Sequence, residues 1–203
     1  MITETDHKVE VAVYQKEKAG ANCCGDHYFY TETDQGFICA LADGLGSGQE
    51  AKESAQIVID AIKDNPFANE DLLIEQCVGR LWGKRGVVLG ILNLNFTTST
   101  YRFSSIGNIG MIRMTSKHKR YRHIPCAGYL AGYKRELKIT EGKLEDGMNF
   151  FMFSDGITDQ ELSCLSFTKD VDEAINAFKW MNCNDTRQDD TTLIAMGYRK
   201  KLG

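Results

Sequence analysis

Acidic side chains stand at four places in the sequence where a strand-like run meets a glycine or a turn. These places are Gly25-Asp26, Asp43-Gly44, Ser154-Asp155-Gly156 and Asp189-Asp190. A carboxylate at the end of a strand lies at the rim of a sheet, where strand ends from distant parts of a chain can meet. Taken singly, Asp43-Gly44 and Asp155-Gly156 are also turn signals, because Asp-Gly favours tight turns. Asp189-Asp190 could equally be a solvated loop or a helix-strand boundary, and Gly25-Asp26 alone carries almost no information. We therefore interpret the ordered set as more specific than any of its members.

Carboxylates gathered in this way suit hard divalent cations. Mg²⁺ and Mn²⁺ prefer oxygen ligands, and a set rich in Asp with only four histidines in the chain favours them over zinc. Two such ions ~3.5–4 Å apart can lower the pKa of a shared water and clamp the attacking and leaving oxygens of a phosphoryl transfer. Glycine after Asp43 leaves the backbone carbonyl of Gly44 free to turn toward a metal, because no Cβ is in the way.

Strands and helices must bring these residues together. Alternating and buried apolar runs predict strands at residues 9–13, 28–32, 37–42, 87–94, 98–106, 110–114, 137–144, 149–154 and 191–198. Ser47 and Glu50 match a capping box, which predicts a helix directly after them. A second helix is expected after Asn69, and a late one from Asp170 with Met181 on its apolar stripe. This order predicts an α+β fold of two mainly antiparallel sheets packed face to face, with helices outside.

Length and composition set the broad class of the protein. With 203 residues, 42% hydrophobic and 26% charged, we expect one globular domain over residues 1–203, with a core from about 9 to 198. A net charge of −4 disfavours a nucleic-acid binder. No apolar run approaches the ~20 residues of a membrane helix, and residues 1–6 do not resemble a signal peptide. The seven cysteines, an odd number, are expected as free thiols, which predicts a cytoplasmic protein. A monomer without membrane or nucleic-acid partners is expected.

The ordered motifs resemble those of the metal-dependent PPM serine/threonine protein phosphatases. The stretches that carry this resemblance are Gly25-Asp26, Asp43-Gly44-Leu45-Gly46-Ser47-Gly48, Ser154-Asp155-Gly156 and Asp189-Asp190-Thr191-Thr192. Further segments are similar to the bacterial branch that acts on stress and sporulation regulators, and within it to the short stand-alone phosphatase of the stressosome. They are Val13-Tyr14-Gln15, Cys24-Gly25-Asp26, Lys84-Arg85-Gly86 and Gly107-Asn108. The resemblance implies a four-layer α-β-β-α sandwich.

The same resemblance implies two divalent ions, Mn²⁺ or Mg²⁺, at one end of the sandwich. Asp43 would bridge both ions, with Asp26 and the Gly44 carbonyl completing one site. Asp155 and Asp189 would hold the other. The four residues implied as catalytic are Asp26, Asp43, Asp155 and Asp189. A bridging hydroxide would attack phosphorus in line, and the implied substrates are phosphoserine and phosphothreonine on phosphorylated stressosome scaffold proteins.

Three points are left open by the sequence. Asp190 could replace or support Asp189 as a ligand. Eukaryotic relatives carry an Arg near the first acidic motif to bind phosphate, but the stretch from Gly20 to Gly25 has no Arg or Lys, so a basic group elsewhere or the metals must serve. No general acid is identified. Of the histidines, which we interpret as exposed, His27 beside Asp26 is the first to examine.

Other functions are weighed against the phosphatase. A catalytically inactive, phosphatase-like binding module for a phosphorylated partner is the alternative. Gly46 to Ala51 also fits the nucleotide-binding pattern G-x-G-x-x-A, but two consecutive helices follow where a parallel strand is needed. The basic run from Lys117 to His123 is interpreted as a solvated hairpin, with docking of an acidic phosphoprotein as the further hypothesis.

Overall fold

Two five-stranded antiparallel sheets are found in the computed structural model, which describes residues 7–21, 23–164, 170–182 and 187–200. One sheet has the order β2 (Asp26–Thr33), β3 (Gly36–Gly44), β4 (Val87–Asn95), β5 (Thr100–Ile106) and β8 (Lys138–Lys143). The other has the order β1 (Val9–Lys16), β10 (Thr191–Tyr198), β9 (Asn149–Phe153), β6 (Gly110–Met114) and β7 (Arg120–Arg122). All of these neighbouring strands pair antiparallel.

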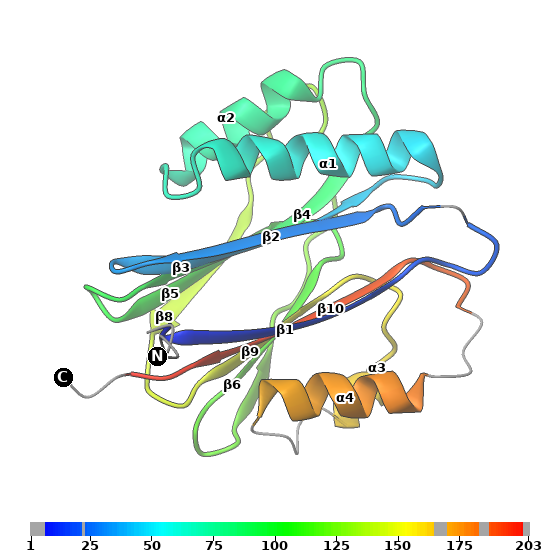
Figure 1. The fold of residues 1–203 in the computed structure, drawn as a ribbon. Helices are drawn as coiled ribbons and strands as arrows, with labels where there is room; N and C mark the ends of the chain where they lie inside the picture. The colour runs from blue at the N-terminus through cyan, green and yellow to red at the C-terminus, as the bar shows by residue number, and fades with distance from the viewer. Residues whose placement is uncertain (1–6, 22, 165–169, 183–186, 201–203) are drawn as a thin grey trace, which may run out of the picture.

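Helices cover the outer face of each sheet (Figure 1). The first sheet is covered by α1 (Gln49–Asp64) and α2 (Glu70–Arg80), and the second by α3 (Asp159–Cys164) and α4 (Val171–Met181). The apolar residues of α1 recur every three or four positions, so they form one stripe, which packs on the buried residues of β3 and β4. The predicted α-β-β-α sandwich is therefore confirmed.

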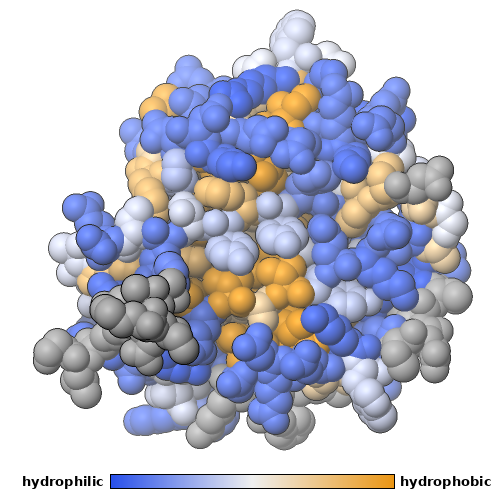
Figure 2. All heavy atoms as spheres, viewed as in Figure 1, coloured by the Kyte–Doolittle hydropathy of each residue, from blue (hydrophilic) through white to orange (hydrophobic). Residues whose placement is uncertain are grey.

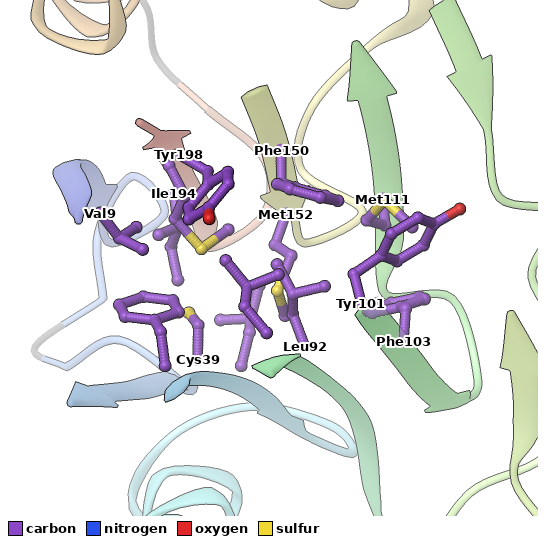
Figure 3. Close-up of a cluster of buried hydrophobic side chains, with 14 of the residues drawn as sticks. Val9, Cys39, Leu92, Tyr101, Phe103, Met111, Phe150, Met152, Ile194 and Tyr198 are labelled. Atoms are coloured by element: carbon purple, nitrogen blue, oxygen red, sulfur yellow. The ribbon is translucent and has the colours of Figure 1, made fainter. Parts of the chain in front are cut away.

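The main core lies between the two sheets. Figure 3 shows side chains of both sheets meeting there, with Cys39 and Leu92 from one side and Met152 and Ile194 from the other. Two further apolar layers lie under the helix pairs. Figure 2 shows that the outer helix layers are mainly hydrophilic, while hydrophobic colour gathers between them at the level of the sheets. Burial of the apolar sheet faces thus fixes how the two sheets stack.

The ends of the helices differ in part from the sequence expectation. Asn69 caps α2 as predicted, by accepting the N–H of Leu72 at 2.9 Å. The capping role of Ser47 is wrong, because Gly48 is the N-cap of α1 and no side chain caps it. The prediction that Met181 lies on the apolar stripe of α4 is wrong. It is the last residue of the helix and is 40% exposed.

Two short elements, β7 and α3, were not predicted from the sequence. β7 and α3 have three and six residues, too few to show a period. The nucleotide-binding interpretation is contradicted, because β3 pairs antiparallel with β4 after the helix pair. The predicted basic hairpin is confirmed between β6 and β7, and its turn lies far from Asp155, since Gly110 rather than Met114 pairs with Phe153.

The cysteines and helices of the described part bear on two further expectations. Cys23, Cys24, Cys39, Cys77 and Cys126 are free thiols. Cys183 and the side chain of Cys164 lie outside the described residues, as do residues 1–6. No helix in the part of the chain that the structure describes has the length and apolar character to cross a membrane.

Candidate metal centre

All four acidic motifs lie at one end of the sandwich, the end opposite the β2–β3 turn (Figure 1). Asp26 begins β2 and Asp43 stands near the end of β3, directly opposite it in the strand pairing. Asp155 follows the end of β9, and Asp189 and Asp190 precede the start of β10. Neighbouring antiparallel strands place the end of one beside the start of the next, so each sheet contributes one pair of acidic positions.

Asp26 is held between the two sheets. Its Oδ2 accepts a hydrogen bond from the Thr192 hydroxyl at 2.7 Å. Gln15 Nε2 lies 3.1 Å from both Thr192 Oγ1 and the Asp26 carbonyl, and it braces the pair. Asp26 is only 2% exposed, and its Oδ1 is buried without a hydrogen-bond partner in the described structure. A buried carboxylate oxygen without a partner is costly, and a cation would satisfy it.

Asp190 anchors the backbone. Its Oδ1 accepts the N–H of Lys18 at 3.0 Å, and its Oδ2 accepts the N–H of Gly25 at 2.8 Å. A Cβ on Gly25 would lie 3.1 Å from the same Oδ2, which explains the glycine beside Asp26. Asp190 is buried, whereas Asp189 is exposed and accepts the N–H of Asp190 through Oδ1 at 2.9 Å. The pair therefore divides into an inner anchor and an outer carboxylate.

Asp155 lies at the surface of the same end. Its Oδ2 accepts a hydrogen bond from Asn108 Nδ2 at 2.6 Å. The next residue is Gly156, where a Cβ would come within 2.3 Å of the Asp190 carbonyl oxygen. Arg187 donates to the Gly156 carbonyl at 2.5 Å and forms a buried ion pair with Glu161. The turn that presents Asp155 is thus fixed from below by α3 and the segment before β10.

The carboxylates repel one another in a partly dry setting. Burial, and next the charges of Asp26, Asp155, Asp189 and Asp190, raise the pKa of Asp43 from 3.8 to about 8. Burial is also the main cause that raises the pKa of Asp26 to about 6, and it raises the pKa of Asp155. Like charges brought together disfavour ionisation, and a divalent cation would reverse that effect.

The acidic side chains lie at the same end of the sandwich, but they do not surround a common point as the ligands of a metal ion do. Among the described residues, no group of three or more His, Cys, Asp or Glu side chains already stands in an arrangement that could hold a metal ion. The carboxylates of the acidic end therefore carry the negative charge that attracts a cation, but their side chains would have to turn toward a common point to bind one.

Gly44 is required by packing as well as by its predicted role. A Cβ on Gly44 would lie 2.0 Å from the Ala51 carbonyl oxygen of α1. The chain after it is tied to β4, because the N–H of Leu45 donates to the Gly86 carbonyl at 2.9 Å. The contribution of the Gly44 carbonyl to a metal site stays a prediction.

Neither His27 nor His123 contributes its side chain to the group of carboxylates at the acidic end. His27 follows Asp26 along β2, so its side chain points to the other face of the sheet. Its electrostatic neighbours there are Lys52 and Asp60 of α1, and burial lowers its pKa. The expectation that each histidine is exposed is wrong for His27, which is half-buried. It is also wrong for His123, which is 5% exposed and hydrogen-bonded to Ser105 at 2.9 Å and Thr140 at 3.0 Å. Because His123 is the last residue of a basic run, the sequence pattern indicated exposure rather than burial.

Comparison with known proteins adds one curated relative and close structural neighbours. The chain is 33% identical to the phosphoserine phosphatase RsbX of Bacillus subtilis over 196 residues, which cover 95% of this chain and 96% of that one. The crystal structure of RsbX in complex with magnesium matches with a TM-score of 0.86 and 31% identity, covering 96% and 98% of the two chains. A protein described with the bacterial stressosome matches with a TM-score of 0.81 and 24% identity, covering 94% and 100%. No family model matches the chain.

Proposed function

The chain belongs to the RsbX family of phosphoserine phosphatases, and we propose that it hydrolyses phosphoserine and phosphothreonine in proteins with two divalent metal ions at the acidic end of its sandwich. The observation that carries the metal proposal is Asp26, whose buried Oδ1 has no hydrogen-bond partner in the described structure. The magnesium in the RsbX crystal structure supports a divalent ion, as does a set of donors made of oxygen atoms alone.

Five residues would hold the ions: Asp26, Asp43, the carbonyl of Gly44, Asp155 and Asp189. Held by these residues, Mg²⁺ or Mn²⁺ would supply an activated water nucleophile for in-line attack on phosphorus and charge neutralisation for the leaving oxygen. Asp43 would serve both ions, and its position opposite Asp26 and the effect of the four other carboxylates on its pKa support this role. We assign Asp190 to support, because both of its oxygens already accept backbone N–H groups.

The protein residues prepare this end before any substrate arrives. Thr192 and Gln15 fix Asp26, and Asn108 orients Asp155. Asp190 draws the loop between β1 and β2 against the start of β10, which keeps the Asp26 backbone in place. Positions held in this way need little reorganisation when charge develops on the phosphoryl group.

The substrates are proposed to be stressosome scaffold proteins phosphorylated on serine or threonine, and the place of action the cytoplasm. Support comes from the sequence resemblance, the RsbX relative and the shared fold with a protein described with the bacterial stressosome. Residues 1–203 are proposed to form one phosphatase domain. The inactive binding module gains no support, since the relative is a phosphatase and the acidic set is complete.

Phosphate release from a phosphoserine peptide tests the proposal. The wild type should release phosphate with Mn²⁺ or Mg²⁺ and not with excess EDTA. Asp43→Asn should lose at least about 10³-fold in kcat, because it removes the carboxylate shared by both ion sites. Asp34→Asn, the same change in the β2–β3 turn at the opposite end, is the matched control and should keep full activity. Activity that survives EDTA, or equal activity in the two variants, would refute the metal site.

A further inference from the structure

Arg85 precedes β4 and lies beside the loop that leaves Asp43 and Gly44. Gly44 pairs with Val87 in the sheet, so the residues just before β4 border this loop. The Nη1 of Arg85 donates to the Leu45 carbonyl at 3.4 Å, which places the guanidinium two residues along the chain from Asp43. A basic side chain therefore stands at the acidic end, although it comes from a segment 42 positions later than Asp43 in the sequence.

The Arg85 guanidinium is held by hydrogen bonds to its neighbours, but not all of its N–H groups are used. Its Nε and Nη2 each lie 2.6 Å from the same Glu50 oxygen, Oε2. Gly46 has φ +94, which favours glycine, and a Cβ there would lie 2.2 Å from Nη1, so a larger residue would displace the guanidinium from this position. These contacts use three of the five N–H groups of an arginine. One hydrogen on Nη1 and one on Nη2 have no protein partner within the described residues, and the side chain is 44% exposed.

We propose that Arg85 is a substrate-binding residue that receives the phosphate group at the acidic end, an inference that rests on the proposed function. A phosphate monoester approaching several carboxylates is repelled unless cations offset the charge. The stretch from Gly20 to Gly25 offers no basic side chain for this. The planar fork of an arginine suits two phosphate oxygens, and here Nη1 and Nη2 each keep one N–H that neither Glu50 nor Leu45 uses. Glu50 is the positioning residue, because it occupies the other edge of the fork.

Lys84 offers a matched comparison at the adjacent position. It carries the same charge and forms a similar ion pair, with Nζ 2.6 Å from Glu53 Oε1 and 38% of the side chain exposed. Glu53 lies almost one helical turn further along α1 than Glu50, away from the loop after Asp43. Lys84→Ala thus repeats the loss of a charge and of an ion pair without touching that loop.

Steady-state kinetics on a phosphoserine peptide and on p-nitrophenyl phosphate separate these roles, with inorganic phosphate as a competitive inhibitor. Arg85→Ala should raise KM for both substrates and Ki for phosphate about 10- to 100-fold. Arg85→Lys should recover part of the loss, since it keeps the charge and lacks the fork. Lys84→Ala should stay within about twofold of the wild type. Thermal melts check folding, and Arg85→Gln replaces the alanine variant if that one melts early.

The outcomes distinguish the inference from the function on which it rests. An active wild type with equal constants in Arg85→Ala and Lys84→Ala would overturn the role of Arg85 and leave the phosphatase standing. Loss on the peptide alone, with p-nitrophenyl phosphate and Ki unchanged, would also overturn it, because Arg85 would then contact the polypeptide. A wild type without metal-dependent activity would overturn the proposed function and this inference together.

Discussion

Asp26 and Asp43 face each other across two paired strands, and both are largely removed from water. Without a cation, burial and next the charges of neighbouring carboxylates disfavour ionisation, and they raise the pKa of Asp26 to about 6 and that of Asp43 to about 8. The residue types and their order could be read from the sequence. The surroundings of the Asp26 carboxylate could not, because Thr192, which donates to its Oδ2, belongs to the other sheet, and because the burial of its unpartnered Oδ1 is a tertiary property.

The stability of the metal-free protein should depend on pH through these two residues. Their folded pKa values lie above the unfolded value of 3.8, so the folded state binds more protons between about pH 4 and 8. The free energy of unfolding from these groups therefore falls as pH rises through that window. Asp43→Asn removes the larger part of the effect. Urea denaturation in EDTA should show this variant more stable than the wild type at pH 8, with the difference vanishing near pH 4. A constant difference would contradict the coupling.

Asp189 and Asp190 should behave differently when each is changed. Asp190→Ala removes the acceptors of two backbone N–H groups and should cost about 2–4 kcal/mol of unfolding free energy. Asp189→Asn at the exposed position should change stability by no more than about 0.5 kcal/mol and should abolish metal-dependent phosphate release. Urea melts and phosphate assays on both variants check this. The reverse pattern would move the ligand role to Asp190.

At the scale of the elements, antiparallel pairing brings each acidic motif to a strand end beside its partner. The sequence patterns predicted most strands and three helices, because their apolar residues recur with a clear period. The patterns failed where contacts between elements determine the position of a helix end or the existence of a short helix. Gly48 replaced Ser47 as the cap of α1, and α3 was too short to predict although it carries Glu161, the partner of Arg187.

The Arg187–Glu161 pair should be a main support of the Asp155 turn. Its side chains are 5% and 12% exposed, and Arg187 also holds the Gly156 carbonyl. Arg187→Ala should lower the free energy of unfolding by about 3–5 kcal/mol, because it removes the cationic partner of Glu161 and the donor to the Gly156 carbonyl from a largely buried site. Arg122→Ala breaks the pair with Asp159 on the same helix, where the side chains are 47% and 78% exposed, and should cost less than about 1 kcal/mol. Similar losses in the two variants would show that burial of the first pair has no special effect.

At the scale of the whole molecule, the proposed metal centre depends on two sheets stacked with their acidic ends together. Strand ends could be located from the sequence, but which ends of the two sheets coincide is set by the core between them and by the Asp26–Thr192 contact. Arg85 shows the same limit, because its place beside the Asp43 loop follows from the pairing of β3 with β4.

Anomalous scattering from a crystal grown with Mn²⁺ tests the central claim most directly. We expect two peaks ~3.5–4 Å apart, with Asp43 between them and with Asp26 and Asp155 on opposite sides. The same crystal form of Asp43→Asn should lose at least one peak. A wild-type map without peaks at this end, or with manganese bound only elsewhere, would contradict the account.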